Sequence, residues 1–157
     1  MSLASLQRDL NGLTDVAIDT AIFIAAADVN DEWHPHATWL LRAVEEGRFR
    51  GTISVINAAE VLVGAFARGS ENGIARRVRL ENYPNLAIVP LSLDLATGAA
   101  QIRAATKLPL PDAVVLATAI QARCQAIVHA DREWVRRTDA LQSTIRIIYL
   151  GDGKTRG

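Results

Sequence analysis

The sequence predicts an α/β domain built on a mostly parallel, five-stranded sheet. Short runs rich in β-branched residues alternate with longer stretches of helical spacing, and this alternation is typical of parallel sheets. Half of the 157 residues are apolar, which is enough for one well-buried domain and too few residues to expect two. Ligands of such open sheets bind beyond the carboxyl ends of the strands, so a functional site is expected at that edge.

The predicted strands are short and bounded by residues that favour turns. Gly47 and Gly51 bracket the turn before the second strand, and Pro90 follows the third. A Pro contributes no backbone N–H to a sheet ladder, which supports a strand end at Val89. The five predicted strands cover residues 16–18, 52–55, 86–89, 126–129 and 145–149.

Helical spacing occupies most of the chain between these strands. Pro84 stops the helix before the third strand, and Pro109 and Pro111 keep the next two helices apart. The longest purely apolar run, residues 21–27, is far below the roughly 20 residues that span a bilayer, so no membrane association is expected. The predicted helices cover residues 35–46, 57–68, 70–82, 93–106, 112–123 and 132–138.

The two ends of the chain differ from the predicted domain over residues 15–150. Residues 1–14 form an extension in which Leu3, Leu6, Leu10 and Leu13 have near-helical spacing, which indicates a short amphipathic helix packed on the body. Residues 151–157 are glycine-rich and charged, and a frayed tail is expected there.

The composition narrows the classes of function. Lys plus Arg equals Asp plus Glu at 17 each, so any binding of nucleic acid depends on a local basic patch. The single cysteine, Cys124, has no partner for an internal disulfide, and the first residues lack the charged-then-apolar order of a secretory signal. These features predict a cytoplasmic protein.

Four carboxylates are the strongest candidates for a functional site: Asp19, Glu60, Asp112 and Asp131. Asp19 ends the first strand and Asp131 follows the fourth. Glu60 lies within about 60° of both Ile56 and Val63 on a helix that advances roughly 100° per residue, so it is expected to face inward. Four acids aimed at one place repel one another unless a cation lies between them, which indicates a divalent-metal site.

Each acid also has a structural alternative. Asp19 is a plausible turn former, and Glu60 is compatible with the half-exposed edge of an apolar stripe. Asp112 and Asp131 both lie where a cap would accept bonds from the first backbone amides of a helix. Singly, each signal is weak, whereas the four in this chain order are much more specific.

In this order the sequence resembles the PIN-domain family, and particularly the VapC-like toxin ribonucleases of bacterial toxin-antitoxin systems. The resemblance runs from about Val16 to Tyr149. It is carried by the segments VAIDT, TISVINAAEVLVG, LPLPDAVVLATAI and IVHADREW, each of which contains one of the four acids. The chain departs from relatives at His129, where Thr or Ser is common, and at Ala130, which replaces a frequent Asn.

The resemblance implies a PIN-like three-layer α/β/α sandwich and a metal-dependent endoribonuclease, the toxin of a toxin-antitoxin pair. Asp19, Glu60, Asp112 and Asp131 would then be the catalytic, metal-binding acids for Mg²⁺ or Mn²⁺. Asp19 and Asp112 are expected as direct ligands, with Glu60 and Asp131 as further ligands or water-orienting groups. The resemblance further implies a homodimer inhibited by a small antitoxin protein that fills the acidic groove.

An RNA substrate requires positive charge around an acidic pocket. Arginines cluster along the helices that follow the second strand. They also cluster after the fourth acid, in the segment that contains Arg132 and Arg137. A histidine that closes a strand is more often held by backbone hydrogen bonds, although His129 is also placed to touch a phosphate. The expected RNA contacts are Thr20, Arg68, Arg76, Arg77, His129 and Arg132.

Two other functions fit parts of the pattern. One is a PIN fold that binds RNA or a protein without cutting it, which the intact set of four acids disfavours. The other is a receiver-like phospho-signalling domain, which also uses strand-end acids with Mg²⁺. A receiver carries paired acids after its first strand and a lysine after its fifth, whereas this chain has only Asp19 and no lysine near Tyr149.

Overall fold

The computed structural model describes residues 1–151, and its centre is a five-stranded sheet in which every pairing is parallel. The strand order is β3-β2-β1-β4-β5. All five predicted strands are present, and two have the predicted bounds. The strands are β1 (Asp15–Ile18), β2 (Arg50–Ser54), β3 (Leu86–Val89), β4 (Ala126–His129) and β5 (Arg146–Tyr149).

The strand order creates a switch point between β1 and β4. From β1 the chain adds β2 and β3 on one side, then crosses over to add β4 and β5 on the other. Helices that follow the neighbouring strands β1 and β4 therefore leave toward opposite faces, and ligands of such sheets bind at the carboxyl ends of strands at this point. This order also differs from the 2-1-3-4-5 order of receiver domains, so the receiver-like alternative is wrong.

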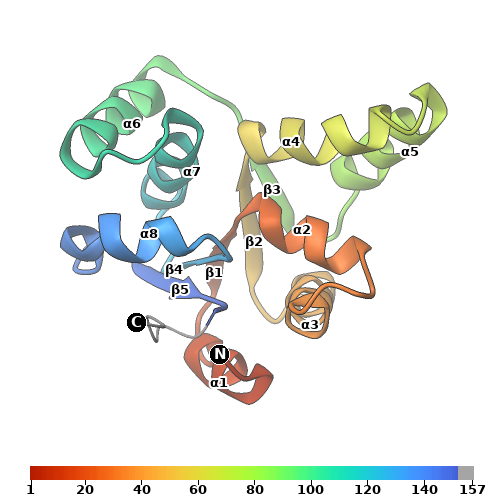
Figure 1. Ribbon diagram of the computed structural model, residues 1–157, viewed down its shortest axis with the longest axis horizontal. Coiled ribbons are helices and arrows are strands. Elements are labelled where there is room, and N and C mark those ends of the chain that lie inside the picture. Colours follow the sequence, from red (N-terminus) through yellow and green to blue (C-terminus); the bar gives the residue numbers. More distant parts are fainter. Residues whose placement is uncertain (152–157) are drawn as a thin grey trace.

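Helices cover both faces of the sheet, as the predicted sandwich requires (Figure 1). Side chains alternate between the two faces: Val16 and Ile18 point into one buried cluster and Ala17 into the other. The first cluster lies under α2 (Thr20–Ala27), α3 (His34–Glu45), α4 (Val55–Phe66) and α5 (Ser70–Glu81). The second lies under α6 (Leu93–Thr106), α7 (Leu110–Gln121), α8 (Arg132–Arg137) and the short 3₁₀ helix η1 (Asp139–Leu141).

Two elements of residues 1–151 were not predicted from the sequence pattern, the short η1 and helix α2. The eight residues of α2, TAIFIAAA, are apolar after the first, so they show no alternation between an apolar and a polar face. Ile22, Phe23 and Ala25 are buried, whereas Ile24 is exposed. The apolar run is therefore a short helix that begins directly after Asp19.

The N-terminal extension contains the predicted helix, α1 (Leu3–Leu10), and it belongs to the main core. Leu6 and Leu10 are fully buried in the same cluster as the strands. Met1 donates its amino group to the Leu150 carbonyl at 3.0 Å, and Arg146 donates to the Asp9 carbonyl at 2.7 Å. These contacts tie α1 to β5.

The predicted frayed tail falls mostly outside the described residues, which end at Gly151. Gly151 itself is buried against the ring of Tyr149. Among the helices of residues 1–151, none combines the length and the apolar character that crossing a membrane requires.

Candidate active site

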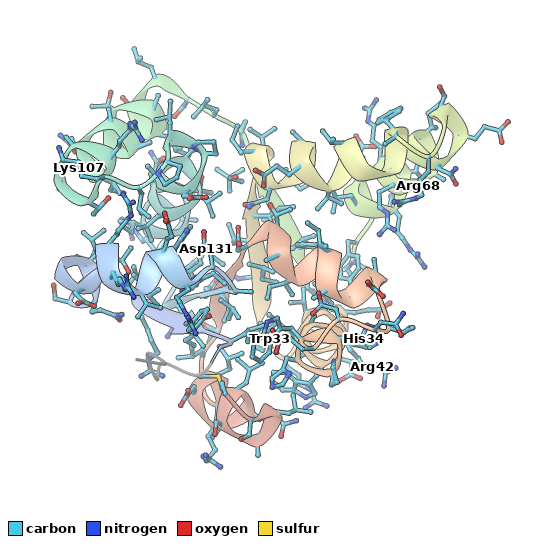
Figure 2. The ribbon with its side chains drawn as sticks, in the orientation of Figure 1. Trp33, His34, Arg42, Arg68, Lys107 and Asp131 are labelled. Atoms are coloured by element: carbon cyan, nitrogen blue, oxygen red, sulfur yellow. The ribbon has the colours of Figure 1, made fainter. Side chains whose placement is uncertain are left out.

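The four predicted acids come from elements that meet at the carboxyl end of the sheet. Asp19 directly follows β1, and Asp131 begins α8 two residues after β4. These two strands are neighbours, so their ends lie side by side at the switch point. Glu60 lies on α4, which starts where β2 ends, and Asp112 lies in the first turn of α7. Figure 2 marks Asp131 at the start of α8.

A buried amide network joins Asp19 to Glu60. The Asn57 Nδ2 donates to Asp19 Oδ1 at 3.2 Å and to Thr20 Oγ1 at 2.9 Å. The Thr20 hydroxyl in turn donates to Glu60 Oε2 in a short hydrogen bond. The Asn57 Oδ1 accepts from the backbone N–H and the hydroxyl of Ser54, each at 3.0 Å. Both acids are therefore oriented by one side chain whose amide is saturated with partners.

The ordinary requirements of helix α4 explain why Asn57 occupies this place. Ser54 caps the helix by accepting from the Asn57 N–H at 3.1 Å, while the Asn57 side chain returns to the Ser54 N–H. This reciprocal capping box fixes the first turn. The Asn57 Oδ1 is used in this cap, and the two hydrogens on Nδ2 are left to donate to Asp19 and Thr20. The residue that caps the helix therefore also orients the acids. The sequence analysis missed this role.

Asp19 has an elevated pKa. Burial is the largest cause of the rise, and the carboxylates of Asp112 and Glu60 raise it further. The backbone amides of Thr20 and Ala21 at the start of α2 oppose the rise. The net effect brings the pKa of Asp19 from 3.8 to about 6. The charges of two other acids therefore act on Asp19, which indicates that these carboxylates lie near one another.

Asp112 and Asp131 form the second half of the site. Burial raises the pKa of Asp112, and so do the carboxylates of Asp131, Glu60 and Glu133. A hydrogen bond from the Trp134 side chain lowers it. Trp134 is buried on α8, so this helix supplies both Asp131 and a donor to Asp112. Trp134 is a second residue that the sequence analysis missed, although it lies only three positions after Asp131.

The capping alternatives have different outcomes for these two acids. The Asp131 carboxylate does cap α8, because its Oδ1 accepts from the Glu133 N–H at 2.8 Å. Pro109, and not Asp112, is the N-cap residue of α7. Asp112 lies inside the first turn, where its charge still complements the helix dipole. A cap therefore accounts for the position of Asp131 but not for that of Asp112.

The predicted inward orientation of Glu60 is wrong. Glu60 is solvent-exposed, and Val63, expected on the same buried face, is 69% exposed. The face of α4 that packs on the body contains Asn57, Ala58 and Ala65 instead. Glu60 follows Asn57 by about one turn, which lets its carboxylate reach the Thr20 hydroxyl at the rim of the site.

Two of the predicted RNA contacts, Thr20 and His129, are buried, so these predictions are also wrong. Thr20 is 6% exposed, and its hydroxyl is engaged by Asn57 and Glu60. His129 is fully buried, with its ring stacked on Trp134 at a centroid distance of 4.9 Å and tilted against Tyr149 at 5.5 Å. Neither side chain is accessible to a polynucleotide in this structure.

The environment of His129 is apolar. Burial lowers the pKa of His129 to about 4, although the Asp131 carboxylate acts in the opposite direction. Neither ring nitrogen makes a hydrogen bond of ordinary geometry with a residue of 1–151, while contact with the Asp131 backbone also acts to raise the pKa of His129. The imidazole is therefore a neutral group packed between the rings of Trp134 and Tyr149.

The predicted arginines occupy two regions. Arg68 and Arg76 line a groove of about 340 Å³ together with Glu60, Phe23 and Val61. Figure 2 marks Arg68 close to the turn between α4 and α5. Arg77 is exposed and pairs with Glu81 at 3.2 Å, and Arg132 is exposed next to Asp131. These side chains, unlike Thr20 and His129, are available to an anionic ligand.

The donor set suits a hard cation. The ionisable groups that gather here are carboxylates, whereas Cys124 and His129 are buried in apolar surroundings. Within residues 1–151, no three Asp, Glu, His or Cys side chains are close enough to enclose a metal ion. The carboxylate chemistry of these groups, and not their spacing, is what fits a hard cation such as Mg²⁺ or Mn²⁺.

A family model supplies the decisive comparison. The PIN domain model matches residues 16–141, which is most of the chain. This protein belongs to the PIN domain family. No curated protein matches the chain.

Solved structures with the same PIN fold agree with the resemblance to VapC-like toxins. A toxin-antitoxin complex from Klebsiella pneumoniae is 26% identical over 85% of this chain and 95% of the other, with a TM-score of 0.62. VapBC2 from Rickettsia felis, bound to a promoter DNA fragment, is 14% identical over 88% and 100%, with a TM-score of 0.65. The Mycobacterium tuberculosis toxin VapC20, which cleaves the sarcin-ricin loop, is 18% identical over 76% and 92%, with a TM-score of 0.60.

Proposed function

We propose that this PIN protein is a metal-dependent endoribonuclease and the toxin of a toxin-antitoxin pair. The observation that carries the proposal is the mutual influence of carboxylates from separate elements, since Asp112 and Glu60 raise the pKa of Asp19 while Asp131 raises that of Asp112. Such clustering is costly for a fold unless a cation is bound. The family match and the toxin structures support the nuclease assignment.

The chain would contribute orientation and charge to the cleavage reaction. Asp19 and Asp112 are the proposed direct ligands, because both are drawn into the pocket by hydrogen bonds from Asn57 and Trp134. Glu60 and Asp131, at the rim, would hold water molecules in line with the scissile phosphodiester. A bound Mg²⁺ or Mn²⁺ lowers the pKa of coordinated water and neutralises charge on the phosphate. Cleavage would leave 5′-phosphate and 3′-hydroxyl ends.

RNA would approach the acids over the arginines that surround them. Arg68 and Arg76 share a groove with Glu60, and Arg132 adjoins Asp131. These arginines would offset the repulsion between a polyanion and the acidic pocket. The accessible RNA contacts in this proposal are thus Arg68, Arg76, Arg77 and Arg132, without Thr20 and His129.

An antitoxin segment has a suitable channel beside the acids. The groove at Glu60 adjoins a larger pocket of about 590 Å³, and the two share Phe23, Ala27, Val61 and Arg76. Arg79 also lines the larger pocket. The two pockets combine apolar residues with arginines and with the acidic residues Asp28, Glu45 and Glu60. Such a lining would fit an inhibitory peptide with apolar side chains and with acidic groups directed at the arginines.

A homodimer, also proposed, would use the same end of the molecule. Four large apolar side chains are exposed near the starts of α4, α6 and α7: Val55, Leu91, Leu93 and Leu110. Leu93 is the most exposed of them, at 83%. Exposed apolar side chains near one end of a protein favour association there.

The test is cleavage of RNA by the purified protein with and without Mg²⁺ or Mn²⁺. We expect wild-type activity only with metal, and a fall of roughly 100-fold or more in Asp19→Asn and Glu60→Gln. Glu71→Gln is the matched control, because Glu71 is exposed on α5. Equal cleavage by all four proteins would assign the activity to a contaminating nuclease. A folded wild type that binds RNA without cutting it would favour the non-cleaving alternative.

A further inference from the structure

The connection between α6 and α7 is held by side chains from two different helices. It consists of Lys107, Leu108 and Pro109, and it leads into the helix whose first turn carries Asp112. Lys107 has a left-handed backbone, with φ of 62°, and ends α6 as its C-cap. A non-glycine residue in this region is strained, so the surrounding contacts must stabilise it.

Each backbone carbonyl of the connection has a defined donor. The Pro109 carbonyl accepts from the Ala113 N–H at 3.0 Å, which begins the hydrogen bonding of α7. The Leu108 carbonyl accepts from Arg103 Nη1 on α6 at 2.6 Å. The Lys107 carbonyl accepts from Arg137 Nη1 on α8 in a short hydrogen bond. Two consecutive carbonyls are thus fixed by two guanidinium groups.

Arg137 reaches the connection from the helix that carries Asp131. Its Nη2 also lies 3.4 Å from the Glu133 carboxylate one turn earlier on α8. The Glu133 N–H is in turn capped by Asp131. Asp131 and the segment before Asp112 are therefore linked through the side chain of Arg137. A shift of α8 relative to this connection would change the separation of the two acids.

Arg137 differs from the other arginines near the site because both of its terminal nitrogens have partners within the protein. Arg137 is half-buried with both terminal nitrogens engaged. Arg136, one position earlier on the same helix, is exposed and has neither a hydrogen bond nor an ion pair with any described residue. The Arg137 guanidinium is therefore held in place by a carbonyl and a carboxylate of the protein itself.

We propose that Arg137, with Arg103 as its partner, is a positioning residue that sets the spacing of Asp112 and Asp131 by locking the α6–α7 connection to α8. The inference rests on the proposed function, because that spacing matters for a shared metal ion.

The test compares Arg137→Ala with Arg136→Ala in the full chain. Mn²⁺ affinity is measured by calorimetry without RNA, and backbone amide exchange is followed over residues 107–114. We expect Arg137→Ala to weaken Mn²⁺ binding about tenfold and to speed exchange at Ala113, because side chains that orient metal ligands have effects of this size. Arg136→Ala should retain wild-type Mn²⁺ affinity and exchange. Arg137→Lys, which keeps the charge but has one donor nitrogen in place of two, should recover part of the affinity.

Several results would overturn the positioning role. One is unchanged Mn²⁺ affinity and unchanged exchange in Arg137→Ala; another is a change in the KM for RNA alone, which would make Arg137 a substrate contact. If Arg137→Ala does not fold, the same criteria apply to Arg137→Lys. Wild-type protein that binds Mn²⁺ but leaves RNA intact would contradict the proposed function only. If the wild type binds no Mn²⁺, the proposed function is contradicted. Equal amide exchange in Arg137→Ala and Arg136→Ala would then also contradict the positioning role of Arg137.

Discussion

Asn57 shows how one residue can serve both the fold and the proposed chemistry. Its amide completes the cap of α4 and also contacts Asp19 and Thr20. The acids could be predicted from the sequence because a carboxylate at a strand end is unusual among apolar neighbours. Asn57 could not be, because an Asn in the first turn of a helix has an ordinary explanation in capping. Only the packing of α4 against β1 and α2 brings it to the acids.

The pKa of Asp19 leads to a prediction about stability in the absence of metal. Its folded-state pKa of about 6 exceeds the ordinary value of 3.8, so the folded protein binds this proton more tightly than the unfolded chain. The contribution of this group therefore favours folding at low pH and is lost as the pH rises from about 4 to above 6. We expect Asp19→Asn, in EDTA, to raise the Tm at pH 7.5 by several degrees, which corresponds to roughly 1–3 kcal/mol.

The pH dependence separates this effect from a general one. At pH 4 the difference in Tm between wild type and Asp19→Asn should be much smaller, because Asp19 is then neutral in the folded protein and only about half ionised in the unfolded chain. Asp28→Asn, an exposed substitution of the same kind, should leave the Tm within a degree or two at both pH values. A stabilisation by Asp19→Asn that is equally large at pH 4 and pH 7.5 would mean that ionisation of Asp19 is not its cause.

At the scale of elements, the pattern of apolar residues predicted helices best where it alternated with polar ones. Helix α6 has the bounds that spacing and punctuation indicated, whereas α2 was missed because its sequence is apolar nearly throughout. Helix α4 was found, but its buried face was assigned to the wrong side. Its sequence is apolar on several sides, and contact with α5 and with the start of α2 decides which side is covered.

Helix α1 is predicted to be an integral part of the core. Leu6 is fully buried in the cluster that contains β1 and α3. We expect Leu6→Ala to lower the free energy of unfolding by about 2–4 kcal/mol, because it removes a buried side chain and leaves a cavity. Chemical denaturation measures the change. Gln7→Ala, at an exposed position of the same helix, should change stability by no more than about 0.5 kcal/mol. A similar small change in Leu6→Ala would show that α1 is dispensable.

Across the whole protein, topology explains why Asp19 and Asp112, more than ninety positions apart, influence one another. The strand order puts β1 beside β4 and β2 beside β1, so the chain returns to one edge after each helix. That convergence was predictable from alternating strands and helices. The residues that orient each acid were not predictable. Asn57 and Thr20 contact Asp19 and Glu60, whereas Asp112 and Asp131 depend on Trp134 and on the proposed positioning by Arg137.

The four acids are proposed to form one cation-binding centre, and titration of the metal-free protein with Mn²⁺ measures whether they do. Calorimetry on wild type should show binding that is weakened at least about tenfold in each of Asp19→Asn, Glu60→Gln, Asp112→Asn and Asp131→Asn. Glu71→Gln should bind as wild type does. Wild-type Mn²⁺ affinity in two or more of the four site variants would contradict a single shared centre.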